Sequence, residues 1–220
     1  MQKKRLNIFS GKRYFIKTPW WLKKIYPARL WSVSTNKKII YLTFDDGPHP
    51  IATPFILDQL HQYQAKATFF CIGKNVLAYP EIYDRIIGEG HKTGNHTNNH
   101  LNGWQTKHSI YLADVAECAK AVETDLFRPP YGKLRSSQAK KIAEIIRKPT
   151  AKIVMWDVLS GDFDESLSKE KCLENVIENA GPGSIVVFHD SQKAWEKMSF
   201  ALPQILSHFN KKGFFFEKIE

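Results

Sequence analysis

Residues 39–47 read IIYLTFDDG, an apolar and β-branched run that ends in two carboxylates and a glycine. The run shows no alternation of polar and apolar residues, which is typical of a parallel strand covered on both faces. Comparable but sometimes weaker runs follow at 67–72, 91–95, 126–128, 153–156, 184–188 and 213–218. The sequence therefore predicts about seven strands.

Amphipathic stretches separate these runs. They predict helices over residues 52–63, 80–88, 109–124, 136–147, 168–180 and 195–209. Ser109 is a candidate N-cap, and the sequence GPG at 181–183 is a helix stop signal. Strands that alternate with helices indicate right-handed β-α-β crossovers and a parallel sheet. From spacing alone, a closed or nearly closed barrel and an open doubly wound sheet both fit.

The composition is that of a globular domain. The chain has 220 residues, of which 43% are hydrophobic and 25% are charged, and this excludes disordered, collagen-like and coiled-coil proteins. No apolar run approaches the ~18 residues of a membrane-spanning helix. The three cysteines, Cys71, Cys118 and Cys172, are far apart and form no C-x-x-C pair, so we expect reduced, buried thiols.

The net charge of +10 belongs to the N-terminal part of the chain. Residues 1–38 hold eleven Lys or Arg and no acid, while the remainder holds 21 bases and 22 acids. Seven aromatic residues share this segment: Phe9, Tyr14, Phe15, Trp20, Trp21, Tyr26 and Trp31. Cations mixed with aromatics suit an anionic surface, such as lipid headgroups, nucleic acid or an acidic wall polymer.

A second interpretation of this segment is a wrap, with its aromatics packed on the domain and its lysines in solvent. We favour the wrap, because Pro19 and Pro27 interrupt any long amphipathic helix. The segment also lacks the apolar core of ~7–15 residues that a secretory signal needs. The sequence therefore predicts a cytoplasmic protein without a transmembrane segment. Peripheral membrane association through residues 1–38 stays open, and we expect no specific nucleic-acid partner.

Five polar clusters fall where predicted strands end, which is where active sites of α/β proteins sit. The first is the adjacent pair Asp45 and Asp46. Two neighbouring carboxylates repel each other, so they can share a cavity only in different roles, one binding a metal and the other taking a proton. The alternative is an Asp-Gly turn with a solvated neighbour.

The second cluster is GNHTNNH at 94–100. His96 and His100 are four residues apart and would share a face over one helical turn, so both imidazoles could reach one metal. The asparagine-rich filler favours a loop with a single turn. An isolated pair is more often a surface or hydrogen-bonding pair. Combined with a carboxylate from the first cluster, however, it makes an Asp-His-His set with open positions, which is the catalytic arrangement.

The remaining clusters are FRPPYG at 127–132, MWDVLSGDF at 155–163 and VVFHD at 186–190. Arg128 reads as a guanidinium aimed at a carboxylate, or as an exposed arginine in a turn. The two prolines would fix the Tyr131 N–H, a candidate oxyanion donor. In the fourth cluster, a core tryptophan followed by a polar loop is an equally good interpretation. His189 follows an apolar strand and would point into the site.

Together the clusters resemble the polysaccharide deacetylase family, also called the NodB-homology domain or carbohydrate esterase family 4. The chain shows TFDDG at 43–47, HTNNH at 96–100, RPPY at 128–131 and VFH at 187–189, in the order of the family's motifs. The similarity spans roughly residues 38–220. It implies a distorted (β/α) barrel with about seven parallel strands.

The resemblance also implies a metal site and a substrate. Asp46, His96 and His100 would bind a divalent metal, usually Zn²⁺. The implied reaction is hydrolysis of N-acetyl groups on an amino-sugar glycan or glycolipid. Asp45 would be the general base and His189 the general acid. On this basis we divide the chain into the basic, aromatic-rich segment 1–37 and the catalytic domain 38–220.

Three further roles follow from the resemblance. Arg128 would hold the base, the Tyr131 N–H would help to bind the oxyanion, and Asp162 would tune His189. Two positions depart from the family pattern: Asp162 is followed by Phe163 where the family usually has Asp-Trp, and Val187 stands where the family prefers Leu. Substrate detail is therefore open. The alternatives are an O-acetyl esterase or non-sugar amide hydrolase on the same site, or a non-catalytic glycan-binding module.

Overall fold

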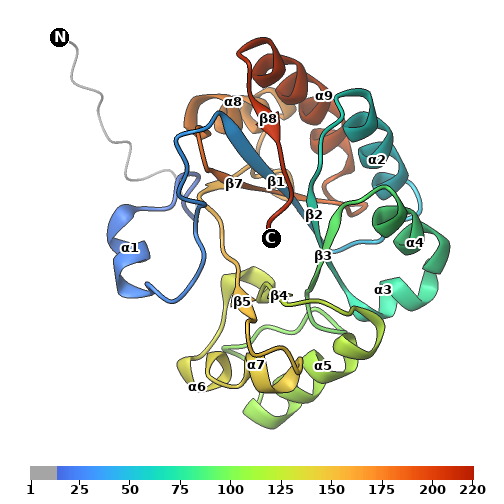
Figure 1. The fold of residues 1–220 in the computed structure, drawn as a ribbon, viewed down its shortest axis with the longest axis vertical. Coiled ribbons are helices and arrows are strands. Elements are labelled where there is room, and N and C mark those ends of the chain that lie inside the picture. Colours follow the sequence, from blue (N-terminus) through green and yellow to red (C-terminus); the bar gives the residue numbers. More distant parts are fainter. Residues whose placement is uncertain (1–13) are drawn as a thin grey trace.

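The computed structural model of the protein describes residues 14–220. Six of the basic and aromatic residues counted above lie outside the described residues: Lys3, Lys4, Arg5, Phe9, Lys12 and Arg13. Figure 1 shows a curled sheet with helices around its outside, and α1 (Trp20–Ile25) standing apart from the other helices.

The sheet is parallel throughout, and its strand order is β5-β4-β3-β2-β1-β7-β6, with β8 paired to β1. The strands are β1 (Ile39–Asp45), β2 (Thr68–Cys71), β3 (Lys92–Asn95), β4 (Leu126–Phe127), β5 (Lys152–Ile153), β6 (Val158–Leu159), β7 (Ile185–His189) and β8 (Phe215–Phe216). The path runs from β5 to β6 without closing on itself. The prediction of a distorted (β/α) barrel with about seven parallel strands is confirmed, although β6 was missed as a separate strand.

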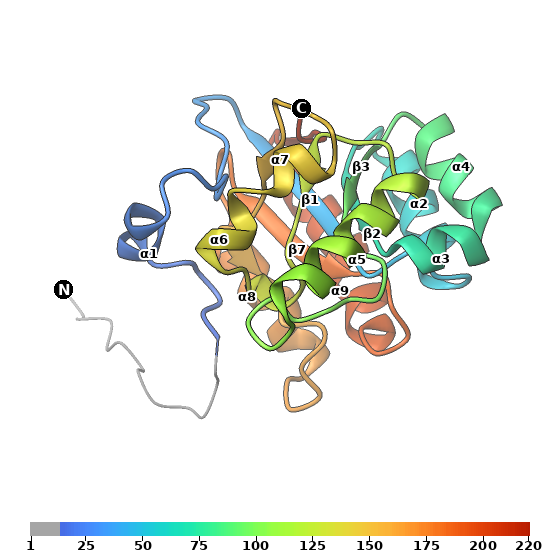
Figure 2. The ribbon, with the colours of Figure 1, turned by 90° about the horizontal axis from the view of Figure 1, so that it is seen from below.

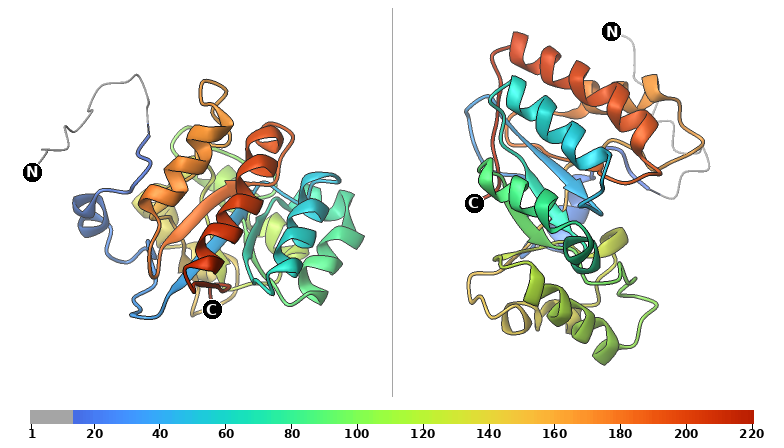
Figure 3. Two further views of the ribbon diagram at one scale, coloured as in Figure 1. Left: turned by 90° about the horizontal axis from the view of Figure 1, so that it is seen from above. Right: turned by 90° about the vertical axis from the view of Figure 1, so that its right-hand side faces the viewer.

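The helices cover the sheet. They are α2 (Ala52–Gln62), α3 (Gly73–Ala78), α4 (Pro80–Gly88), α5 (His108–Ala121), α6 (Ser136–Ala139), α7 (Ile142–Ile145), α8 (Lys169–Asn179) and α9 (Trp195–Lys211), with a 3₁₀ turn at Pro130–Gly132. In the right-hand view of Figure 3, α9, α2 and α4 lie side by side over one face of the sheet. The central strands β1, β2 and β7 are buried along nearly their whole length, which explains why they carry continuous apolar runs.

The helix prediction needs correction at four points. Sequence analysis missed α1 and α3, and the single helix expected over 136–147 is two short helices separated by a turn at 140–141. The helix α5 begins at His108 after Lys107, so Ser109 is not its N-cap. The side chain of Ser168, by contrast, caps α8 by accepting a hydrogen bond from the Lys171 N–H.

The core centres on β1. Leu42 and Phe44 have no exposed surface, and the Phe44 ring stacks on Phe69 and Phe188 from the two neighbouring strands, at centroid distances of 5.1 and 6.1 Å. All three cysteines are buried and free, as expected. Because this packing fixes β1, β2 and β7 together, it also fixes the residues that follow them at the carboxyl edge of the sheet.

The N-terminal segment bridges the gap between the two edge strands. Leu30 N donates to Ile153 O at 2.9 Å and Leu30 O accepts from Met155 N at 2.7 Å, alongside β5. Further back along the segment, Thr18 N donates to Asp157 O at 2.8 Å, just before β6. The segment thereby pairs backbone groups that open sheet edges would otherwise leave exposed.

A buried carboxylate anchors this segment. Asp157 lies 2.5 Å from Lys17 Nζ, 2.6 Å from Lys23 Nζ and 2.7 Å from Ser184 Oγ. Burial opposes its ionisation, but hydrogen bonds from the two lysines and the serine outweigh burial and lower the pKa of Asp157. The wrap interpretation is thus correct for some residues only. Trp31 is buried, whereas 68% of Trp20 is exposed on α1, which projects from the body in Figure 2.

No helix within residues 14–220 combines the length and the apolar character that a membrane crossing requires.

Candidate active site

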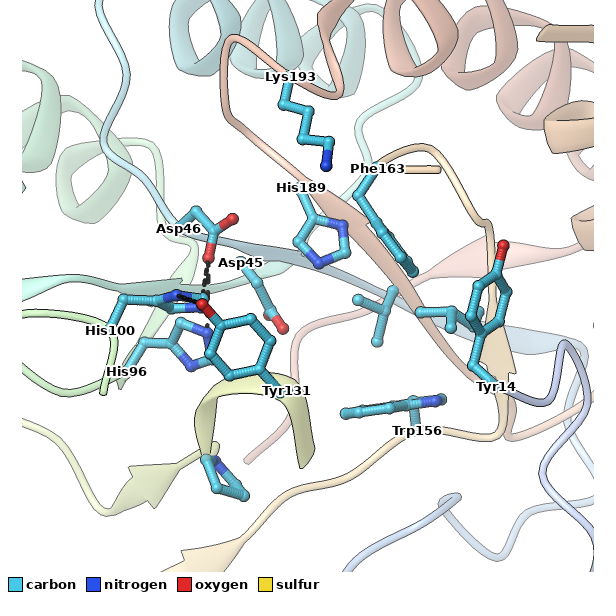
Figure 4. A pocket seen from close by; sticks show the side chains of 13 residues that line it. Tyr14, Asp45, Asp46, His96, His100, Tyr131, Trp156, Phe163, His189 and Lys193 are labelled. Atoms are coloured by element: carbon cyan, nitrogen blue, oxygen red, sulfur yellow. Dashed lines mark hydrogen bonds and ion pairs between the residues drawn. The ribbon is translucent and has the colours of Figure 1, made fainter. Parts of the chain in front are cut away.

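A pocket of about 450 Å³ opens at the carboxyl edge of the sheet, and Figure 4 shows its side chains. Six of the eight predicted site residues line it: Asp45, Asp46, His96, His100, Tyr131 and His189. Arg128 and Asp162 lie behind its wall and are fully buried. The pocket is also lined by Tyr14, Pro129, Trp156, Leu159, Phe163, Val187 and Lys193.

Arg128 is fully buried, and each of its three guanidinium nitrogens donates at least one hydrogen bond. It donates to Asp45 Oδ1 and to Thr43 Oγ1 at 2.7 Å each, and to the carbonyls of Met155 and Val154 at 2.9 and 3.3 Å. The guanidinium also lies 4.0 Å from the centroid of the Phe70 ring. Asp45, which is 4% exposed, is therefore held in one position at the pocket wall.

Asp46, His96 and His100 converge on one point. Asp46 Oδ1 is 3.6 Å from His96 Nε2 and 3.2 Å from His100 Nε2, and one ligand atom from each residue lies within 4.8 Å of the other two. Asp46 Oδ1 is buried without a hydrogen-bond donor among the described residues. Two imidazoles and a carboxylate oxygen arranged this way fit a divalent metal such as zinc.

His96 is in the protonation state that binds a metal. Burial lowers its pKa to about 4, so the ring is neutral at physiological pH. Its Nδ1 is 2.8 Å from the Arg128 carbonyl, which can only accept a hydrogen bond. The carbonyl therefore fixes the proton on Nδ1 and leaves the Nε2 lone pair facing Asp46.

The charge of Asp46 is also set by its surroundings. Burial opposes ionisation, but the close approach of His100 and the charge of His189 outweigh it, and the pKa of Asp46 lies well below its usual range. The ring of His100 is oriented from the other side, with Nδ1 3.1 Å from the Tyr131 hydroxyl.

The loop that carries the two histidines contains no helical turn, contrary to the expectation. Thr97 and His100 instead adopt left-handed backbone conformations, with φ values of 64° and 56°. Strained conformations of this kind persist only where the surroundings enforce them. The enforcing group is Asp114 on α5, whose carboxylate accepts hydrogen bonds from the backbone of Asn98 and Asn99 at 3.0 Å each.

His189 faces the cluster across Asp45 (Figure 4) and has the opposite electrostatic environment from His96. Burial disfavours its charged form, but the charge and hydrogen bond of Asp162 prevail and raise the pKa of His189 to about 10. Asp162 Oδ1 is 2.8 Å from His189 Nδ1, and Oδ2 accepts from the His189 backbone N–H at 2.7 Å. The His189 ring packs against the Phe163 ring in an edge-to-face arrangement, with 5.2 Å between the ring centroids.

Tyr131 lies over His100, with a ring-centroid distance of 4.6 Å, and 60% of its surface is exposed. Its backbone is left-handed, with φ of 58°, inside the short 3₁₀ turn after two prolines. No described group accepts a hydrogen bond from the Tyr131 N–H. This N–H is therefore available to a ligand.

Sequence analysis missed several supports of the site. Asp190 is 1% exposed and accepts hydrogen bonds from Gly47 N at 2.8 Å and Thr53 Oγ1 at 2.6 Å, which holds the loop after β1. Burial raises the pKa of Asp190 to about 8. Asn75 on α3 donates to the Asp46 carbonyl at 2.7 Å. Asp190 directly follows His189, so its position at a strand end was a usable signal. For Asn75 and Asp114 no local pattern exists.

Comparisons with known proteins identify a family for the chain. The polysaccharide deacetylase family model matches residues 32–148. A peptidoglycan-N-acetylglucosamine deacetylase of Bacillus cereus is 36% identical over 192 residues, covering 84% of this chain and 88% of that protein. A chitooligosaccharide deacetylase of Azorhizobium caulinodans is 33% identical over 165 residues, covering 72% and 76% of the two chains.

A solved structure shares the fold. The crystal structure of the peptidoglycan N-acetylglucosamine deacetylase Bc1960 superimposes with a TM-score of 0.79 at 32% identity, covering 92% of this chain and 95% of that one. More than half of the chain matches the family model, and relatives above 30% identity extend over most of it. The chain therefore belongs to the polysaccharide deacetylase family, carbohydrate esterase family 4.

Proposed function

We propose that the protein is a metal-dependent hydrolase that removes N-acetyl groups from an amino-sugar glycan or glycolipid. One observation carries the proposal: Asp46, His96 and His100 meet in the same pocket as Asp45 and His189. The relatives named above are deacetylases of peptidoglycan and of chitooligosaccharides, which supports the substrate class.

Asp46, His96 and His100 would hold the metal, for which we propose Zn²⁺ from the donor set. A divalent cation there supplies Lewis acidity, which makes water a better nucleophile and polarises a carbonyl. The neutral ring of His96 and the ionised carboxylate of Asp46 are the forms that such a cation needs.

Asp45 acts as the general base. Its Oδ1 is occupied by Arg128, and no described donor is bonded to Oδ2, which leaves that oxygen to accept a proton from the attacking water. As the water oxygen bonds to the acetyl carbon, negative charge moves to the carbonyl oxygen, and the Tyr131 N–H donates to it. Arg128 keeps the base in place and takes no proton itself.

His189 completes the reaction as general acid. Asp162 keeps its ring protonated, so the imidazolium can donate a proton to the amine nitrogen as the carbon–nitrogen bond breaks. The products are acetate and a free amino sugar, and the proton taken up by Asp45 replaces the one that His189 gives. An O-acetyl ester or a non-sugar amide would react through the same groups.

The N-terminal segment, 1–37, supports a second proposal, peripheral contact with an anionic membrane. Four large apolar side chains around α1 are exposed, and we call them the α1 patch: Phe15 (54%), Trp20 (68%), Trp21 (44%) and Ile25 (59%). Lys24 Nζ lies 4.9 Å from the Trp20 ring, and no acid precedes Asp45 in the sequence. Exposed tryptophans beside lysines suit the interface of anionic lipids.

The roles of Asp45 and His96 separate in mutants. We expect Asp45→Asn to retain the metal and to lose about 10²- to 10⁴-fold in kcat, because it removes the base and leaves the three proposed metal ligands unchanged. His96→Ala should lose the metal together with activity. Acetate release from chitooligosaccharides and peptidoglycan fragments, with metal content by mass spectrometry, measures both. The control is His61→Ala, an exposed histidine on α2. A fully active Asp45→Asn enzyme would refute the assignment of Asp45 as the general base. If metal-loaded protein released no acetate from N- or O-acetyl substrates, the hydrolase proposal would fail and a non-catalytic binding module would be the remaining interpretation.

The pH profile tests the pairing of Asp162 with His189. A general acid works while protonated, so activity is present below the pKa of His189 and is lost as the pH rises through it. Because Asp162 raises that pKa, Asp162→Asn should shift the basic limb of kcat to lower pH. The direction holds whether or not a cation occupies the nearby site. The control is Asp84→Asn, which changes an exposed carboxylate on α4 and should leave the pH profile unchanged. If the basic limb of the Asp162→Asn profile stays where it is in wild type, the pairing of Asp162 with His189 as general acid is wrong.

Vesicle binding tests the α1 patch. The double variant Trp20→Ser, Trp21→Ser should partition about tenfold less onto phosphatidylglycerol vesicles, since two aromatic side chains no longer leave water. The control is Leu77→Ser, which removes an equally exposed apolar side chain (70%) elsewhere. Cosedimentation of the wild-type protein with phosphatidylglycerol vesicles should weaken as salt is added, and it should not occur with neutral vesicles. Equal binding by the double variant, or retention on DNA but not on vesicles, would contradict the proposal.

A further inference from the structure

A second cavity of about 300 Å³ adjoins the catalytic pocket. The two share four wall residues: Tyr14, Tyr131, Trp156 and Leu159. In Figure 4, Trp156 and Tyr14 stand on the side of the catalytic pocket away from Asp46, His96 and His100. A chain molecule whose reacting unit lies at Asp45 can therefore extend past Trp156 into this second cavity, which we call the side groove.

The N-terminal segment builds one wall of the side groove. It contributes Tyr14, Phe15, Thr18, Leu22, Tyr26, Arg29 and Trp31, while the opposite wall comes from Trp104, residues 131–134, Met155, Trp156 and Leu159. The segment is held in place by its backbone bonds to Ile153 and Asp157 and by the ion pairs of Asp157. The groove is thus a fixed feature of the fold.

The lining combines aromatic faces with cations. Arg29 lies 4.2 Å from the centroid of the Tyr26 ring, and Lys133 Nζ lies 4.1 Å from the Trp104 ring. Aromatic faces pack well against the C–H faces of sugar rings, and they are the usual lining of small-molecule sites. The family motifs contain neither cation, and Arg29 precedes the residues that match the family model.

These cations have no anionic partner in the described structure. The side groove contains no Asp or Glu, and neither Arg29 nor Lys133 forms an ion pair with a residue of 14–220. Arg29 is half-buried and donates to the Leu134 carbonyl at 3.3 Å, and burial lowers the pKa of its guanidinium. A guanidinium that has lost part of its hydration without gaining a carboxylate favours binding of an anion from outside.

We propose that the side groove binds a carboxylated sugar next to the N-acetylated sugar that reacts, with Arg29 and Lys133 pairing with its carboxylate. The inference rests on the proposed function and narrows it to acidic amino-sugar glycans. The carboxylate could belong to a lactyl ether or to a uronic acid, which the choice of substrate distinguishes.

The experiment compares kcat/KM for three tetrasaccharides. One is neutral chitotetraose, one alternates N-acetylglucosamine with N-acetylmuramic acid, and one alternates N-acetylglucosamine with glucuronic acid. Wild type should favour at least one acidic chain. Arg29→Gln and Lys133→Gln should each lower the acidic-to-neutral ratio about tenfold, the effect of losing one charge-assisted contact. Arg29→Lys keeps the positive charge and should recover part of the acidic-to-neutral ratio that Arg29→Gln loses.

The matched control is Lys169→Gln, which removes a lysine stacked 4.8 Å from the Phe200 ring, away from both cavities. Its acidic-to-neutral ratio should equal that of wild type. Unchanged ratios in both groove variants would overturn the proposal, and so would a ratio in Arg29→Lys as low as in Arg29→Gln.

Binding separates this proposal from the proposed function. Titration of the acidic tetrasaccharides should quench the fluorescence of the tryptophans that line the groove, with an affinity that falls in Arg29→Gln and at high salt. Arg29-dependent binding without acetate release would leave the side groove standing and refute the hydrolase. Acetate release without any preference for acidic over neutral chains would support the hydrolase and refute the side-groove proposal.

Discussion

The buried ion pair between Arg128 and Asp45 is the interaction on which the site depends. The guanidinium comes from the end of β4 and binds β1 through Thr43 and Asp45, and it also binds the chain after β5 through two carbonyls. Removing one partner would strand a charge in the barrel centre, at a cost of about 3–5 kcal/mol. The same residue's carbonyl orients His96, so the base and a metal ligand share one support.

His96 is buried and His189 is largely buried, and the pKa values of these two histidines on either side of Asp45 are shifted in opposite directions. His96 meets a neutral carbonyl, and burial then keeps its ring uncharged, while His189 meets the carboxylate of Asp162 and becomes a cation. Burial disfavours the charged form in both cases, so the partner atom at Nδ1 decides the outcome. A pocket that holds one neutral and one protonated imidazole can bind a cation at one end and release a proton at the other.

The sequence predicted most of this arrangement because its signals are local. Continuous apolar runs marked the main strands, and short polar motifs at their ends marked Asp45, His96, Arg128 and His189. What it could not supply depends on distant pairing. Spacing alone fitted both a barrel and an open sheet, since the closing contacts join Leu30 to Ile153, more than a hundred residues away.

The same limit explains the details that were missed. The histidine loop was expected to contain a helical turn, but Asp114, on a different element, imposes left-handed residues instead. The two-residue strand β6 is too short for a periodic signal, and it exists because β7 pairs with it. The side groove has no motif at all, because its walls come from segments separated along the chain.

The central claim is that Asp46, His96 and His100 share one cation beside Asp45 and His189. Anomalous diffraction at the zinc edge, from crystals of protein loaded with one equivalent of zinc, tests it most directly. The account predicts the strongest peak at coordination distance from the Asp46 carboxylate and both Nε2 atoms. A strongest peak bounded by other residues, or no peak in this pocket from protein that retains its zinc, would contradict it.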